Sequence, residues 1–70
     1  MLESLRSLPG LTERSTGTFY RGSVAFLHFH ADPAGLFADL KVDGEFVRSR
    51  TTTKSEQQRL VRAARRSLGA

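Results

Sequence analysis

Two histidines and one aspartate are the residues whose types and spacing best suit chemistry. His28 and His30 are two positions apart in the segment Phe-Leu-His-Phe-His, and Asp39 follows a turn sequence. Two imidazoles and a carboxylate can bind a metal ion, so these three residues are candidate metal ligands. An imidazole beside a carboxylate could also serve as the general base of an enzyme. No nucleophile lies in a recognisable motif, so we prefer a binding role to an enzymatic one.

Strands must position these side chains, because apolar and polar residues alternate through the middle of the chain. In the register that sets apolar residues opposite one another, Leu27 pairs with Leu40, and Leu40 pairs in turn with Val47 on the core face. Asp39 then pairs with Arg48 on the other face. His28 then lies beside Asp39 on the same sheet face. The predicted strands are 18–21, 24–31, 36–42 and 45–51, joined by turns at Gly22-Ser23, Asp32-Pro33-Ala34-Gly35 and Asp43-Gly44.

A helix is predicted at each end of the chain. Leucines at helical spacing indicate a short helix before Pro9-Gly10. Thr53 with Glu56, or equally Ser55 with Gln58, has the spacing of a capping box, which predicts a helix from there to about Leu68. The expected fold is therefore α+β, a single domain over residues 1–70 with a four-stranded antiparallel meander and both helices on one face.

The sheet face away from the helices is predicted to be the binding face, because it mixes aromatic and charged side chains. Exposed aromatic surface of this extent is unusual on a monomer, so a ligand, nucleic acid, a second copy or a terminal segment of the chain should cover it. We expect a homo-oligomer and hence a small assembly or binding module. Single-stranded nucleic acid, stacked on the rings, is the alternative partner. The predicted face comprises Phe26, His28, His30, Phe37, Asp39, Lys41, Phe46, Arg48 and Arg50, with Phe19 and Arg21 on the first strand.

Positive charge is concentrated in the last part of this basic chain. The formal net charge is +4 over 70 residues. Arg59, Arg62 and Arg66 are three and four positions apart, so they share a helix stripe that could follow phosphate groups. The same arginines could instead simply keep a small protein in solution.

Several classes of protein are not favoured by the composition. The chain has no cysteine, which excludes disulfides and thiolate zinc sites and is compatible with a reducing compartment. Neither GxxxxGK[ST] nor GxGxxG occurs, and no cofactor is expected. The start does not have the pattern of a signal peptide, and no apolar run has membrane-spanning length. A cytoplasmic location without a membrane partner is therefore expected.

Three segments resemble small bacterial members of the luciferase-like domain family. They are Phe26-Leu-His-Phe-His, Gly35-Leu-Phe-Ala-Asp-Leu, and Thr53-Lys-Ser-Glu-Gln-Gln-Arg-Leu-Val before the terminal helix, with Leu8-Pro-Gly-Leu as a lead-in. The family usually has a longer segment between the sheet and the final helix than this chain has. The resemblance implies an α+β sheet, and it implies neither light emission nor any catalytic residue.

Overall fold

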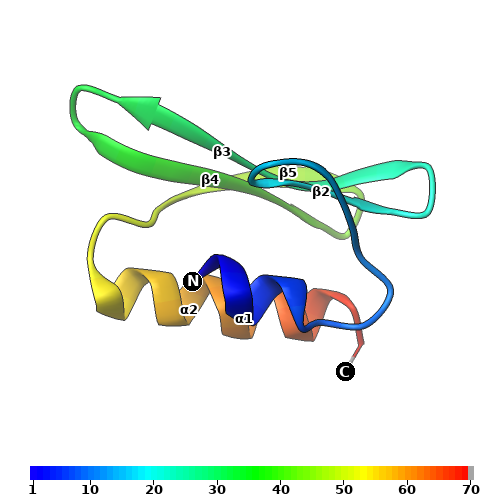
Figure 1. The fold of residues 1–70 in the computed structure, drawn as a ribbon. Coiled ribbons are helices and arrows are strands. Elements are labelled where there is room, and N and C mark those ends of the chain that lie inside the picture. Colours follow the sequence, from blue (N-terminus) through cyan, green and yellow to red (C-terminus); the bar gives the residue numbers. More distant parts are fainter. Residues whose placement is uncertain (70) are drawn as a thin grey trace.

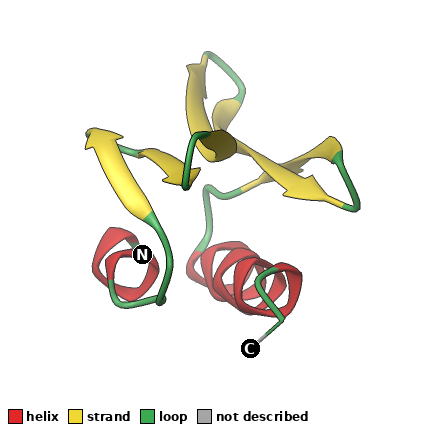
Figure 2. Cartoon of the chain, turned by 90° about the vertical axis from the view of Figure 1, so that its right-hand side faces the viewer, coloured by secondary structure: helices red, strands yellow, loops and turns green. Residues whose placement is uncertain are grey.

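The computed structural model describes residues 1–69 as a helix, five strands and a second helix. Ala70, the last residue of the predicted domain, lies outside the described residues. The strands form one antiparallel sheet in the order β1-β2-β3-β4-β5. Both helices lie on one side of this sheet (Figures 1 and 2), which confirms the predicted α+β class. The elements are α1 (Leu2–Arg6), β1 (Thr12–Ser15), β2 (Thr18–Arg21), β3 (Val24–Asp32), β4 (Gly35–Val42), β5 (Glu45–Arg50) and α2 (Lys54–Ser67).

The sheet has one strand more than the four predicted. β1 is polar throughout and lacks the alternation by which the other strands were recognised. It becomes a strand because β2 offers it a hydrogen-bonding edge and because Gly17, with φ of 77°, allows a tight return. Glu13 strengthens this arrangement, since its carboxylate accepts hydrogen bonds from Arg6 on α1 and from the Gly17 N–H.

The predicted register of the two longer hairpins is confirmed. Leu27 pairs with Leu40, and Asp39 pairs with Arg48. At the turn of the β4–β5 hairpin, Asp43 and Gly44 both have positive φ, as a type I′ turn requires. The β3–β4 hairpin is longer than predicted, because its pairing extends to Asp32 and Gly35 and leaves a loop of only two residues, 33–34.

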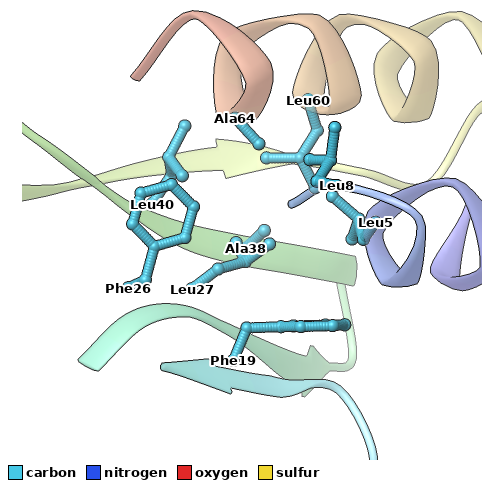
Figure 3. Packing of buried hydrophobic residues seen from close by; sticks show 9 residues of the cluster. All are labelled: Leu5, Leu8, Phe19, Phe26, Leu27, Ala38, Leu40, Leu60 and Ala64. Carbon is cyan, nitrogen blue, oxygen red and sulfur yellow. The ribbon is translucent and has the colours of Figure 1, made fainter. Parts of the chain in front are cut away.

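A β-bulge changes which residues of β3 face the core. Phe19 pairs with Leu27 and Tyr20 pairs with Ala25, so Phe26 is the extra residue on β3. Phe26 and Leu27 are consecutive and yet both buried. The prediction that Phe26 lies on the binding face is therefore wrong, as Figure 3 shows.

Phe19 is also placed in the core rather than on the binding face. Its side chain is only 1% exposed and packs with the other buried residues between the sheet and the helices (Figure 3). By alternation along β2, Arg21 lies on the same side as Phe19, so the prediction for both residues is wrong. The buried hydrophobic residues are Leu5, Leu8, Phe19, Phe26, Leu27, Ala38, Leu40, Leu60 and Ala64.

The capping box predicts the start of α2 correctly. The Thr53 hydroxyl accepts a hydrogen bond from the Glu56 N–H, and the Glu56 carboxylate accepts one from the Thr53 N–H. Leu60 and Ala64 are the buried residues of α2, which packs against β4. Neither helix within residues 1–69 has the length and hydropathy needed to cross a membrane.

Candidate functional site

Asp39 is the centre of a polar cluster on the open sheet face, the face without helices. It lies on the central part of β4, between His28 on β3 and Arg48 on β5. Its buried neighbours Ala38 and Leu40 point toward the helices, so alternation directs Asp39 to the open face. Its side chain is only 12% exposed because the neighbouring side chains cover it.

Arg48 holds Asp39 through two hydrogen bonds. Its Nε atom donates to Oδ1 at 2.8 Å and its Nη2 atom donates to Oδ2 at 3.1 Å. Paired N–H groups match the geometry of a carboxylate, so this contact fixes the orientation of the acid. The guanidinium lowers the pKa of Asp39 to about 2, with a smaller contribution from His30, although burial acts in the opposite direction.

His30, not His28, makes the hydrogen bond to Asp39. The Nε2 atom of His30 is 2.9 Å from Oδ2, whereas that of His28 is 3.9 Å away. His28 is the direct cross-strand neighbour of Asp39, and His30 reaches it diagonally from its position opposite Phe37. The imidazole that a carboxylate orients is therefore that of His30. The sequence places both histidines correctly on the face and does not distinguish their roles.

Aromatic contacts extend the cluster toward β5. The His28 ring meets the His30 ring edge to face at a centroid distance of 4.8 Å, and the Phe46 ring at 5.0 Å. The Lys41 ammonium lies 4.8 Å from the centroid of the Phe46 ring, within cation–π range. The structure therefore keeps the two histidines, Lys41 and Phe46 together on the open face. Of the four phenylalanines predicted there, Phe37 and Phe46 remain, because Phe19 and Phe26 are buried.

The arginines of α2 lie away from the open face. The helix buries Leu60 and Ala64 toward the sheet and exposes Arg59, Arg62 and Arg66. Because α2 lies beneath the sheet (Figure 2), these arginines and the cluster at Asp39 form two separate basic surfaces.

Strand β5 is exposed on both of its sides, which the sequence pattern does not predict for the helix side. All six of its residues are exposed, including Val47 at 52% and Phe46 at 43%. Val47 was expected in the core beside Leu40, with which it pairs, but α2 packs against β4 and leaves β5 uncovered. A signal was present in the sequence, because the helix-facing positions of β5 are Glu45, Val47 and Ser49, of which one is apolar. A strand with one apolar residue on its inner side contributes little to a core.

A hollow of about 420 Å³ lies between β5 and α2. Leu40 and Val47 form part of its wall on the sheet side, and Leu60 and Ala63 form part of its wall on the helix side. Arg50, which is predicted for the binding face, has its side chain at this hollow instead, because its Nε atom lies 3.8 Å from the oppositely charged Glu56 carboxylate of α2. The edge strand therefore has an apolar recess beneath it.

Comparison of the chain with protein-family models, curated proteins and solved structures finds no match. The resemblance to the luciferase-like domain family therefore stays a prediction.

Replacing Asp39 by asparagine is expected to lower the free energy of unfolding by about 1–2 kcal/mol at pH 7, because Arg48 loses its ionic partner. One pKa unit corresponds to about 1.4 kcal/mol, so the fall in the pKa of Asp39 from 3.8 to about 2 sets an upper limit of roughly 2.5 kcal/mol. Solvent around the Arg48 side chain, which is 61% exposed, screens part of this interaction. This stabilisation is complete above the unfolded pKa and is lost as the pH falls through the folded value. Urea unfolding with EDTA present, followed from pH 7 to pH 2, should show the difference between the two proteins closing below pH 4.

Asp32→Asn is the matched control, since Asp32 is an exposed carboxylate on the same hairpin that holds only the Ala34 N–H of its turn. Asparagine retains that acceptor. A pH-independent loss for Asp39→Asn would contradict the ionic origin of the stabilisation.

Proposed function

We propose that the protein is a small self-assembling binding module in which two copies pair along β5. Their open faces then form one continuous surface carrying two copies of the Asp39 cluster. The observation that supports this proposal most directly is the edge strand itself, which is six residues long, regular in its pairing with β4 and exposed at every position. Such an edge is a template for pairing with another strand.

The two edges of the sheet differ in how well they can accept a partner. β1 has four residues, and its pairing with β2 is interrupted by a register shift between Glu13 and Ser15. Short and bulged edges resist pairing. β5 has neither protection, and the charge of Arg48 on it is already neutralised by Asp39. Pairing at β5 is therefore favoured over pairing at β1.

The hydrogen-bonding groups that β5 can offer follow from its turn. In the type I′ turn at Asp43-Gly44, the Glu45 N–H points to Val42 on β4. At the other end the Thr51 N–H donates to the Leu36 carbonyl at 2.7 Å. Residues at odd positions thus point their backbone groups to β4, and the backbone groups of Phe46, Arg48 and Arg50 point outward.

The outward edge is complementary to itself in the antiparallel direction. If the two-fold axis passes through Val47, this residue meets Val47 of the second copy on the helix side. Phe46 then lies opposite Arg48 of the second copy on the open face, a pairing suited to a cation–π contact. Val47 and Phe46, the large apolar residues that β5 leaves exposed to water, both become covered. This self-complementarity of β5 favours a second copy of the chain over an unrelated peptide as the partner.

Val47→Asp is expected to convert a dimer into a monomer, because it places two carboxylates opposite each other at the axis. Light scattering during size exclusion should give twice the chain mass of 7.8 kDa for the wild type and 7.8 kDa for the variant. Val24→Asp is the matched control, since Val24 is 50% exposed but lies on β3. A wild type that is monomeric at about 100 μM, or equal effects of both substitutions, would refute the proposal.

Nucleic-acid binding remains a prediction for the same open face. Its aromatic platform is reduced by the burial of Phe19 and Phe26, and Arg48 is engaged with Asp39. These two facts make pairing at β5 the better-supported proposal.

A further inference from the structure

We propose that His28, His30 and Asp39 form a binding site for a transition-metal dication of the Zn²⁺ type. One ligand atom from each residue lies within 4.8 Å of the other two. The residues belong to β3 and β4, so the site does not depend on pairing at β5. Imidazole nitrogen and carboxylate oxygen are the ligands that Zn²⁺ takes in sites with three protein ligands.

The distances within the cluster fit a shared ion. The Nε2 atoms of His28 and His30 are 3.9 Å and 2.9 Å from the same oxygen, Oδ2 of Asp39. Bond lengths of about 2.0–2.2 Å in a tetrahedral zinc site separate ligand atoms by roughly 3.3 Å. The two observed distances lie on either side of this value, whereas the widest separation among the ligand atoms is 4.8 Å. Changes of side-chain torsion must therefore bring the ligands closer together around one ion.

The backbone around the ligands is already fixed. His28 and His30 share one face of β3, and Asp39 lies opposite His28 on β4. These two strands are paired continuously from Leu27 to Asp32. Ligands on paired strands lose little further conformational freedom when an ion binds, which favours affinity.

A position for a water or another ligand remains on the solvent side. The side chains of His28 and His30 are 31% and 40% exposed, so the ion would be reached from solvent. Asp39 supplies a carboxylate that is held in place by Arg48. Its charge balances part of the charge of a divalent ion.

Arg48 supports the site and also competes with it. Its Nε bond to Oδ1 orients the carboxylate in the way that outer residues orient metal ligands. Its Nη2 bond, however, is directed to Oδ2, the oxygen on which both imidazoles converge. Because Arg48 is 61% exposed, its side chain can swing away when an ion binds. Removing this positive charge should therefore tighten zinc binding.

Zinc titration by calorimetry tests the site with ZnCl₂ as the probe. We expect one zinc per chain, an increase in the melting temperature with stoichiometric zinc, and at least a tenfold loss of affinity for His28→Ala, His30→Ala or Asp39→Asn. Asp32→Asn should bind like the wild type, and Arg48→Gln should bind zinc more tightly.

Three results would overturn this site. They are an unchanged melting temperature with stoichiometric zinc, binding that persists unchanged in His30→Ala, and one zinc for every two chains, which would place the ion between copies. The same zinc titration on the Val47→Asp variant tests the metal site independently of pairing at β5. Val47 lies on the helix side of β5, whereas the three ligands lie on the open face of β3 and β4. A monomer that binds zinc supports the metal site even if pairing fails.

Discussion

Phe26→Ala is expected to lower the free energy of unfolding by about 3–5 kcal/mol, the range for a large buried side chain replaced by a small one. Phe26 is 3% exposed and packs in the core with Leu40. A domain of 70 residues has a total stability of roughly 4–10 kcal/mol, so the variant should lose from about a third of this stability to all of it. Urea unfolding followed by circular dichroism measures the loss.

Phe46→Ala is the matched control, because the same atoms are removed from a side chain that is 43% exposed. We expect it to cost less than about 1 kcal/mol. Both substitutions are best made in the Val47→Asp chain, so that pairing does not contribute to stability. Equal losses would show that Phe26 and Phe46 share the open face, as strict alternation predicts, and would argue against the bulge.

The register of the β3–β4 and β4–β5 hairpins could be predicted because local and cooperative signals agree. Asp43-Gly44 requires one turn geometry, and the opposition of Leu27 to Leu40 requires one pairing. A slip of one residue would expose the core residues, so the alternatives are strongly disfavoured. For this reason the sequence also predicts that Asp39 and Arg48 are neighbours, and that His28 and His30 share their face.

The bulge could not be predicted from alternation, because its cause lies in the pairing of β3 with β2. The segment Ala25-Phe26-Leu27 fits a regular strand equally well when it is read alone. Two adjacent large apolar residues gain more from burial together than a regular ladder would allow, and one extra residue on β3 permits this. The same shift takes Phe26 off the open face and leaves that face more polar.

The exposure of β5 was missed for a different reason. Pairing of Val47 with Leu40 places both residues on the helix side, as predicted. Register does not determine how far a helix covers a sheet, which depends here on α2 packing against β4. Sequence patterns do not determine where a helix lies across the width of a sheet. The exposed edge at β5, the candidate pairing surface, results from the position of α2 beneath β4.

Gly35→Ala is expected to lower the free energy of unfolding by about 2–4 kcal/mol. Gly35 has φ of 134°, a conformation that costs other residues about 1–3 kcal/mol. An added Cβ atom would also clash with the Thr52 hydroxyl oxygen. That oxygen accepts a hydrogen bond of 3.0 Å from the Leu36 N–H, worth about 1 kcal/mol. The contact joins the start of β4 to the segment that leaves β5 for α2. Urea unfolding of the variant and wild type measures the cost.

Gly22→Ala and a double mutant separate the clash from backbone strain. Gly22 has φ of 63° and no atom within 4 Å of an added Cβ, so its substitution should cost only about 1–2 kcal/mol. Thr52→Ala removes the clashing oxygen and leaves ordinary contact with the Thr52 Cβ position. Gly35→Ala with Thr52→Ala should therefore cost at least about 1 kcal/mol less than the sum of the single losses. If the losses of stability in the two single mutants simply added, the whole effect of Gly35→Ala would come from backbone strain. The Thr52 side chain would then move aside without cost. The junction between β5 and α2 would then not be fixed by this contact.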